Sequence, residues 1–246
     1  VGCDSMNLIR AKDYDQLSRI AAGLIAAQVN RKPDSLLGFA TGSSPIGTYQ
    51  QLIAMCKAGD VDFSRVSTVN LDEYVGLPAD HPQSYARFMR ENLFDHINII
   101  LSNTNIPNGM DPNPDSECCR YDGIIRGFGG VDLQLLGIGH DGHIGFNEPA
   151  DHFSHGTNCV TLTEMTIEAN KRFFDSADDV PRQALTMGIY DIMMAKSIVM
   201  VVTGADKAEI LKAAVTGPVT PQNPASILQY HPCCTIVADE AAMAKF

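Results

Sequence analysis

The stretch VDLQLLGIGHDGHIGFNEP, residues 131–149, contains the pattern that decides the fold. Its first part, 131–139, is a nearly continuous apolar run, which predicts a strand buried on both faces. Glycines, histidines and acids follow, so the strand ends in a sharply turning polar loop. Such a loop can be a metal site, a cluster of carboxylates and histidine, or an ordinary crowded turn.

The same alternation of strand and helix continues along the chain on both sides of this stretch. Short apolar or β-branched runs predict strands, and apolar residues at helical spacing predict helices. Strands are expected at 36–40, 66–71, 131–139, 197–204 and 234–239, and helices at 14–29, 45–59, 82–97, 114–128, 166–174 and 205–215. Alternating units of this kind predict an α/β fold with a mostly parallel sheet that has helices on both faces.

The 246 residues contain no internal repeat, charge block or low-complexity linker, so we expect a single domain. Met6 is a candidate natural start, which would make residues 1–5 an upstream addition and 6–246 the domain. The seven cysteines form no CxxC pair and no secretory signal is visible. We therefore expect reduced thiols and a cytoplasmic location.

The charge and hydropathy of the chain exclude several classes of partner. A formal net charge of −11 argues against a general affinity for nucleic acid or anionic membranes. No apolar run approaches the roughly 20 residues that cross a bilayer. An anionic small molecule remains compatible if backbone N–H groups and a few cations form a local cradle. A homo-oligomer is also compatible with the sequence.

Ligands of parallel sheets bind beyond the carboxyl ends of the strands, so the residues at four strand ends are candidate site residues. The first end is Thr41, Gly42, Ser43 and Ser44, which lead into a helix. Small residues let a ligand approach the backbone, and a helix N-terminus attracts phosphate. A plain serine N-cap without a ligand fits the same residues.

Two cations are candidates for the same anion. Lys207 follows the strand at 197–204 and lies in the first turn of a predicted helix. A cation is unfavourable there unless a bound anion offsets it. Arg172 is the second candidate. Either side chain can equally be a solvated surface group.

Asp72 and Glu73 follow the strand at 66–71. Adjacent carboxylates at a strand end can cap the next turn. Alternatively, one of them can act as a general base, with a pKa that burial brings nearer to the working pH.

The loop after 131–139 can be interpreted as a metal site or as a proton-transfer site. His140 and His143 have HxxH spacing, but the loop lacks the helix that makes an HExxH zinc site credible, so we predict no metal. Asp141, His143 and Glu148 can instead form a hydrogen-bonded set in which a carboxylate fixes the imidazole tautomer. Pro149 favours an extended backbone at Glu148.

Five segments are informative when they are taken together. They are ATGSSPIGTYQQL (40–52), NLDEYVGLPADHPQSY (70–85), GIGHDGHIGFNEPA (137–150), ANKRFF (169–174) and ALTMGI (184–189). Together they resemble the glucosamine-6-phosphate deaminase family over nearly the whole chain. The resemblance implies a modified Rossmann-like sheet. It also implies a hydrolase of amino sugar catabolism, active in N-acetylglucosamine degradation. Such an enzyme converts glucosamine 6-phosphate and water to fructose 6-phosphate and ammonia without a metal or organic cofactor.

The resemblance also implies a role for each acid–base residue. Asp72 would move a proton between C2 and C1 of the sugar. His143 would open the pyranose ring, with Asp141 and Glu148 as its supporting acids. These roles agree with the chemistry, because the hemiacetal must open before the C2 proton becomes acidic.

The loop at 41–44, Arg172 and Lys207 resemble the phosphate-binding positions of the family. The allosteric positions differ. Some family members are activated by N-acetylglucosamine 6-phosphate through basic residues after the NEPA segment and a longer C-terminal tail. Here residues 151–163, DHFSHGTNCVTLT, contain no arginine or lysine. We therefore predict weak or absent activation.

Three alternatives remain at this stage. A 6-phosphogluconolactonase has a similar DGH loop but lacks the FNEP continuation that is present here at 146–149. A deaminase of another phosphorylated aminosugar would carry the same residues. A non-catalytic sugar-phosphate sensor would bind the sugar without releasing ammonia.

Overall fold

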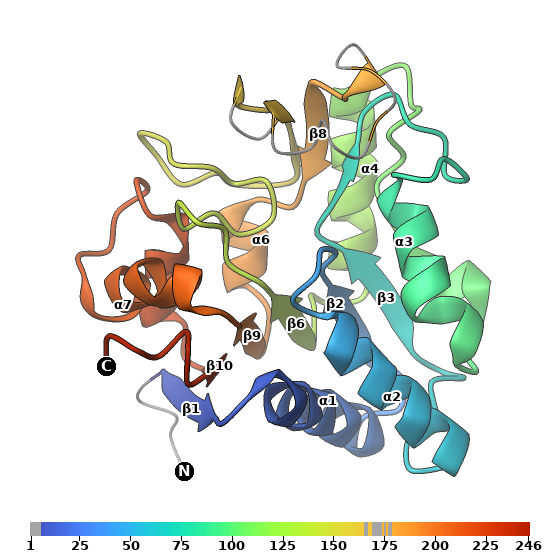
Figure 1. The fold of residues 1–246 in the computed structure, drawn as a ribbon. Helices are drawn as coiled ribbons and strands as arrows, with labels where there is room; N and C mark the ends of the chain where they lie inside the picture. Colours follow the sequence, from blue (N-terminus) through green and yellow to red (C-terminus); the bar gives the residue numbers. More distant parts are fainter. Residues whose placement is uncertain (1–5, 165–166, 169–173, 175, 177–178) are drawn as a thin grey trace.

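The computed structural model describes residues 6–164, 167–168, 174, 176 and 179–246. Its centre is a seven-stranded sheet whose neighbouring strands all pair in parallel (Figure 1). The strand order is β1 (Asn7–Ala11), β10 (Cys234–Asp239), β9 (Ile198–Val202), β6 (Leu133–Leu136), β2 (Leu36–Phe39), β3 (Ser67–Asn70) and β5 (Thr104–Asn105). The predicted mostly parallel α/β fold is thus present.

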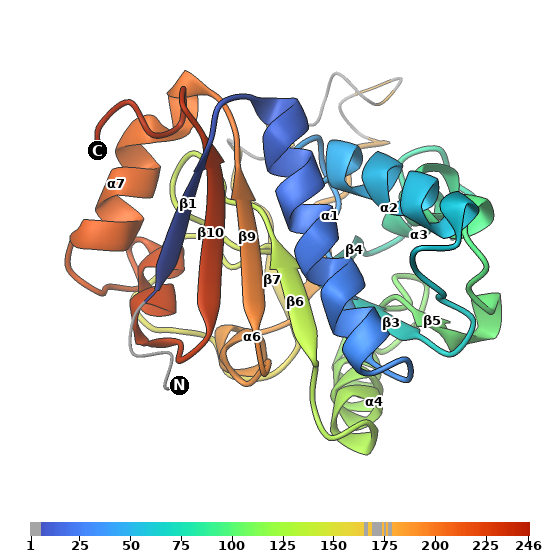
Figure 2. The same ribbon diagram turned by 90° about the horizontal axis from the view of Figure 1, so that it is seen from below.

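Helices cover both faces of this sheet, as predicted (Figure 2). One apolar cluster joins one face to α1 (Tyr14–Arg31), α2 (Ile46–Ala58) and α3 (Tyr85–Asn92). A second cluster joins the other face to α4 (Pro114–Gly127), α6 (Ile189–Met193) and α7 (Ala208–Thr216). Among the described residues, no helix is both long and apolar enough to span a membrane.

Strand β9 shows why the central strands are continuous apolar runs. Val199 and Val201 lie in the cluster beneath α1, whereas Met200 and Val202 lie in the cluster beneath α7. Since successive side chains of a strand point to opposite faces, a strand buried on both faces is mostly apolar, although β6 accommodates the buried Gln134, whose amide donates to Leu135 O at 2.9 Å.

A second, smaller sheet of three strands was not predicted. It contains β4 (Asp72–Tyr74), β8 (Gln183–Thr186) and β7 (Asn158–Thr161) in that order, with antiparallel pairing. The strand expected at 66–71 is present as β3, and the unpredicted β4 begins directly after it, past Leu71. The helix expected at 82–97 ends earlier than predicted, as α3, and a 3-10 turn (Phe94–His96) follows it. Most of the helix expected at 166–174 falls outside the described residues.

The course of the chain changes direction between β2 and β6. From β2 the chain proceeds outward to β3 and β5, and it then returns to the other side of β2 as β6 before continuing to β9 and β10. Two adjacent strands whose connections lead in opposite directions leave a crevice at their carboxyl ends, where ligands of open α/β sheets bind. The fold therefore directs attention to the segments after Phe39 and Leu136.

Candidate active site

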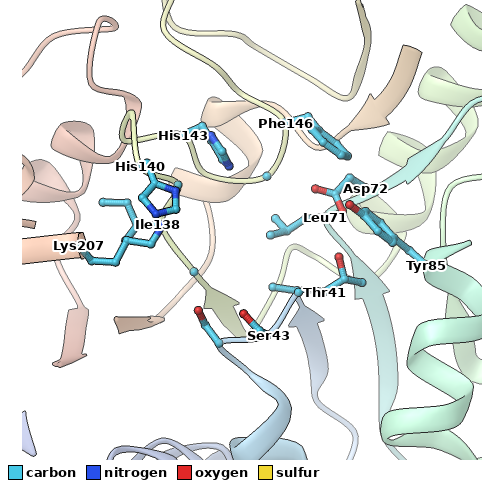
Figure 3. A pocket seen from close by; sticks show the side chains of 16 residues that line it. Thr41, Ser43, Leu71, Asp72, Tyr85, Ile138, His140, His143, Phe146 and Lys207 are labelled. Carbon is cyan, nitrogen blue, oxygen red and sulfur yellow. The ribbon is translucent and has the colours of Figure 1, made fainter. Parts of the chain in front are cut away.

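A pocket of about 280 Å³ opens at this crevice (Figure 3). Its walls come from the segments after β2, β3 and β6, from α3 and from the start of α7. The lining residues are Ala40, Thr41, Gly42, Ser43, Ser44, Leu71, Asp72, Tyr85, Gly137, Ile138, Gly139, His140, His143, Gly145, Phe146 and Lys207. Segments that are distant in the sequence thus meet at one edge of the sheet.

The loop at 41–44 lies at the N-terminus of α2. The residue before the helix is Pro45, whose own side chain makes no capping hydrogen bond, so the alternative of a plain serine N-cap is wrong. The hydroxyl of Tyr14 braces the loop, because it donates to Ser44 O at 3.0 Å and accepts from Gly47 N at 2.8 Å. The hydroxyls and backbone N–H groups of residues 41–44, at a helix N-terminus, suit an anion such as phosphate.

Lys207 lines the same pocket as this loop. It is the residue that precedes α7. Burial lowers the pKa of its ammonium, and the carboxylates of Asp206 and Asp141 oppose this shift. Within the part of the chain that the structure describes, no carboxylate forms an ion pair with it. A half-buried cation of this kind is suited to a bound anion. Arg172, the other predicted cation, lies outside the described residues.

Asp72 is buried on the opposite side of the pocket, next to Tyr85 (Figure 3). Burial, with a smaller contribution from the charge of Glu73, raises the pKa of its carboxyl to about 8. The β6 loop passes close above it, since a Cβ added at Gly145 would lie 3.5 Å from Asp72 Oδ2. Asp72 is thus a carboxyl group that can accept a proton near neutral pH and faces the pocket.

His143 and Asp141 form a hydrogen-bonded pair on the β6 loop. Asp141 Oδ1 accepts from His143 Nδ1 at 2.7 Å and from the His143 backbone N at 3.1 Å. The imidazole partner, together with smaller electrostatic contributions, lowers the pKa of Asp141 to about 2. The ring lies directly over Gly139, where an added Cβ would be 2.1 Å from His143 Cε1. Glycine is therefore required at 139 for this ring position.

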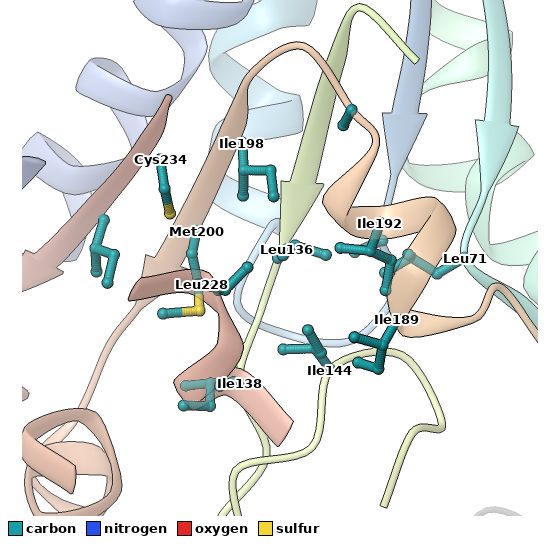
Figure 4. Close-up of a cluster of buried hydrophobic side chains, with 14 of the residues drawn as sticks. Leu71, Leu136, Ile138, Ile144, Ile189, Ile192, Ile198, Met200, Leu228 and Cys234 are labelled. Carbon is teal, nitrogen blue, oxygen red and sulfur yellow. The ribbon is translucent and has the colours of Figure 1, made fainter. Parts of the chain in front are cut away.

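The loop that carries this pair is anchored in the core at both ends. Ile138 and Ile144 are both buried in the cluster on one face of the sheet, where Figure 4 shows Ile138 beside Leu228 and Ile144 beside Ile189. Between these anchors, Gly139 N donates to His143 O at 2.9 Å and closes the turn. The imidazole is consequently presented by a rigid loop.

Glu148, the third member of the predicted set, forms hydrogen bonds with Thr163. Its carboxylate accepts from Thr163 Oγ1 at 3.0 Å and from Thr163 N at 3.3 Å. It is not among the described residues that line the pocket. The structure therefore brings Asp141 and His143 together as predicted, whereas a direct part for Glu148 in that set stays a prediction.

Two other histidines of the segment after β6, His140 and His155, have partners of their own. His140 Nε2 lies 2.6 Å from Asp206 Oδ2 at the exposed rim of the pocket. The ring of His155 stacks on Tyr190, with the ring centroids 4.3 Å apart. In the described residues, no group of three or more histidine, cysteine or acidic side chains could hold a metal ion.

Two aromatic residues of the pocket were missed in the sequence. Tyr85 comes from the first turn of α3, and its hydroxyl lies 3.3 Å from that of Tyr74. Phe146 stacks nearly parallel to Tyr85, with the centroids 6.0 Å apart. Tyr85 does not follow a strand, so attention to strand ends could not find it, whereas Phe146 lies in the loop after β6. The SYARF segment offered only the signal of a serine N-cap.

The geometry agrees with comparisons to known proteins. A family model described as glucosamine-6-phosphate isomerases/6-phosphogluconolactonase matches residues 12–236. The chain belongs to this family. A glucosamine-6-phosphate deaminase of Clostridium perfringens (strain SM101 / Type A) is 52% identical over 237 residues, which cover 96% of this chain and 98% of the relative. One from Lachnoclostridium phytofermentans is 55% identical over 232 residues, which cover 94% and 98%. The predicted family resemblance is confirmed.

Solved structures in this family confirm the fold. A monomeric glucosamine-6-phosphate deaminase superposes with a TM-score of 0.94 at 43% identity, covering 97% of this chain and 99% of that one. A 6-phosphogluconolactonase from Thermotoga maritima superposes with a TM-score of 0.75 at 16% identity, covering 96% and 100%. At that identity the likeness shows the shared fold alone.

Proposed function

We propose that this protein is a glucosamine-6-phosphate deaminase, which converts glucosamine 6-phosphate and water to fructose 6-phosphate and ammonia. One observation carries the proposal. The pocket places a buried carboxyl of raised pKa, Asp72, opposite an oriented imidazole, His143, with an anion-binding loop and Lys207 beside them. The identity of about half of the residues to two deaminases supports the same reaction.

In the proposed mechanism, the phosphate group of the substrate binds first. The hydroxyls and N–H groups of residues 41–44 and the ammonium of Lys207 would bind it, with Arg172 as a further cation. Charge-assisted hydrogen bonds of this kind fix the orientation of a ligand. The binding energy of the phosphate can then be used to position C1 and C2 between Asp72 and His143.

His143 would open the ring. Because Asp141 accepts from Nδ1, the free Nε2 of a neutral imidazole can take the proton of the C1 hydroxyl and return it to the ring oxygen O5. Breaking the C1–O5 bond then gives the open-chain aldehyde. Asp141 holds the ring in this orientation, and Glu148 is proposed to support it from the same loop.

Asp72 would carry out the isomerisation. Its carboxylate takes the proton from C2, the electron pair forms a C1–C2 double bond, and the oxygen on C1 takes a proton from the substrate's ammonium group, which gives an enolamine. Asp72 then returns the proton from C2 to C1, and a protonated imine remains at C2. Water then adds to the imine carbon, and ammonia leaves to give the ketose. The ammonium group of the substrate favours the ionised form of Asp72, because an opposite charge nearby lowers the pKa of a carboxyl.

Metal independence is part of the proposal, as is the action of residues 6–246 as one cytoplasmic catalytic unit of amino sugar catabolism. The described residues of the site offer an imidazole, carboxylates and an ammonium group, which suffice for proton transfer and phosphate binding. The sequence is compatible with a homo-oligomer, and light scattering tests whether one forms. The 43% identical relative is described as monomeric.

The decisive experiment measures both products. Purified protein is mixed with glucosamine 6-phosphate in the presence of EDTA, and ammonia and fructose 6-phosphate are quantified. Equal amounts of the two products support the proposal. Binding without ammonia would identify a sensor, and hydrolysis of 6-phosphogluconolactone instead would identify a lactonase. Loss of activity with EDTA would contradict metal independence.

A further inference from the structure

Glu73 is a buried charge beside the candidate base, and the mechanism above does not use it. Its side chain is 2% exposed. It follows Asp72 directly in β4, and since successive side chains of a strand point to opposite faces, the two carboxylates point in different directions. Asp72 faces the pocket, whereas Glu73 faces the first turn of α3.

Glu73 accepts hydrogen bonds from three backbone N–H groups. Its Oε1 accepts from Tyr74 N at 2.9 Å and from Tyr85 N at 3.0 Å, and its Oε2 accepts from Ala86 N at 2.9 Å. Tyr85 and Ala86 are the first residues of α3, where N–H groups lack partners within the helix. Glu73 therefore joins β4 to the N-terminus of α3.

The same three bonds favour the charged form of Glu73. Burial raises its pKa, and the backbone donors of Tyr85, Ala86 and Tyr74 act against that shift. A helix N-terminus further favours a negative charge. The sequence had left open whether this pair of acids caps the next turn or provides a base. In the structure Glu73 caps the first turn of α3, and Asp72 faces the pocket, where it can act as the base.

Two properties of the pocket depend on this arrangement. Tyr85 forms part of the pocket wall, and Glu73 binds the first two N–H groups of its helix, beside the Ser84 N-cap. The negative charge of Glu73 also opposes ionisation of Asp72, which adds to the effect of burial on the pKa of Asp72. A like charge nearby makes a carboxylate a stronger proton acceptor.

We propose that Glu73 is a positioning residue for the reaction. It anchors α3 so that Tyr85 closes the pocket wall, and its fixed charge keeps Asp72 a strong proton acceptor. This inference rests on the proposed function, because it assigns Glu73 a part in the step that Asp72 carries out.

Other titratable groups around Asp72 come from every element packed against it. Tyr49 of α2, Tyr85 of α3 and Tyr121 of α4 all sense its charge, but burial raises the pKa of each phenol further above neutrality. His143 and Lys207 face the same pocket from the β6 loop and α7. Among the described residues, Glu73 is the group whose charge raises the pKa of Asp72.

The test compares Glu73→Gln with wild type in the pH dependence of kcat/KM for glucosamine 6-phosphate. Removing the charge should move the acidic limb to lower pH by about one unit, because a like charge no longer opposes ionisation of Asp72. An unchanged midpoint with a uniform loss of activity would overturn the electrostatic part. Glu117→Gln is the matched control, since Glu117 is also a buried acid that binds a backbone N–H, of Asn108 at 2.7 Å. Its midpoint should equal that of wild type.

Glu73→Asp keeps the charge but shortens the reach to α3, and it carries the test if Glu73→Gln does not fold. Its midpoint should remain near that of wild type while KM rises several-fold, because Tyr85 loses its anchor. A wild-type KM would overturn the positioning part.

Carbon-13 NMR titration of the aspartate carboxyls gives a readout that does not need turnover. The Asp72 signal is the one that disappears in Asp72→Asn. A lower pKa of that signal in Glu73→Gln supports the inference even if wild type releases no ammonia, in which case the proposed function alone has failed. An unchanged pKa overturns the electrostatic part in either case.

Discussion

One oxygen of Asp141 holds both the ring and the backbone of His143, at 2.7 Å from Nδ1 and 3.1 Å from the backbone N. This contact favours the tautomer in which Nδ1 donates to Asp141, so that Nε2 of the neutral imidazole is the acceptor. A second pair of the same kind, His140 and Asp206, lies 2.6 Å apart on the exposed rim. The two pairs differ in their surroundings: the ring of His143 is packed over Gly139, whereas the ring of His140 is exposed at the rim.

Asp141→Asn should lower kcat by about 10²–10⁴-fold, the range for one positioned acid–base group. The amide can stabilise the wrong tautomer and cannot balance a positive charge on the ring, whereas KM should change little. Asp206→Asn is the control and should change kcat by no more than about twofold, because exposed ion pairs contribute little. Steady-state kinetics of both variants check this. Equal losses in the two variants would refute the role of His143.

Asp72→Asn should abolish ammonia release but retain substrate binding. Asparagine cannot take the C2 proton, and the phosphate contacts at residues 41–44 and Lys207 are unchanged. Exchange of the C2 hydrogen with deuterated solvent, followed by NMR, isolates this step. Normal exchange in the variant would show that another group is the base.

Asp72 should also make the fold less stable as the pH rises. Its pKa is raised from 3.8 to about 8, so the folded protein holds a proton that the unfolded chain releases across this window. Stability is therefore highest below pH 3.8 with respect to this group and is lost as the pH rises towards 8. Asp72→Asn should unfold several degrees above wild type at pH 9, with a much smaller difference at pH 4. Thermal unfolding at both values checks this, and a constant difference would contradict it.

Lys207→Ala should raise KM for glucosamine 6-phosphate by about 10- to 100-fold, the loss expected for a hydrogen bond to a charged group. Lys212, in α7 just after Lys207, is a suitable control, because its ammonium lies over the ring of Phe246, 4.7 Å from the centroid. Lys212→Ala should leave KM unchanged. Titration with inorganic phosphate should likewise give a raised Kd in Lys207→Ala and an unchanged Kd in Lys212→Ala. A similar KM in the two variants would remove Lys207 from the phosphate site.

The sequence predicted which candidate residues line the pocket where those residues come after a parallel strand. Residues 41–44 follow β2, Asp72 follows β3 and His143 follows β6, and all of them line the pocket. Parallel strands bring their carboxyl ends to one edge, so position in the sequence was enough to place them.

The sequence could not place residues whose position depends on contacts between distant segments. Strands β7 and β8 have four residues each and pair antiparallel across more than twenty intervening residues, so local periodicity gave no sign of them. Tyr85 reaches the pocket because Glu73 anchors its helix, a contact that no spacing rule contains. The direction of Glu148, towards Thr163, depends in the same way on the course of the chain after the loop.

Gly139→Ala should disable the site without any loss of a polar group. The new Cβ would lie 2.1 Å from His143 Cε1, so the imidazole has to leave its position beside Asp141. We expect kcat to fall at least as far as in Asp141→Asn. Gly123→Ala in α4 is the control, because its Cβ would meet no atom within 4 Å. Activity assays and a crystal structure of the variant check the displacement. Full activity of Gly139→Ala would show that the ring position is not required.

Addition of N-acetylglucosamine 6-phosphate should activate the enzyme weakly or not at all. Arginine and lysine form strong charge-assisted hydrogen bonds with a phosphate, and residues 151–163 contain neither. The overall charge of −11 makes a site without local cations still less favourable for an anion. We expect a hyperbolic dependence of rate on glucosamine 6-phosphate, with the same kcat and half-saturation when the effector is present, apart from competition at the active site. A sigmoidal curve that becomes hyperbolic on adding the effector would contradict this. It would show that cations from elsewhere in the chain, or from a second copy, complete an activator site.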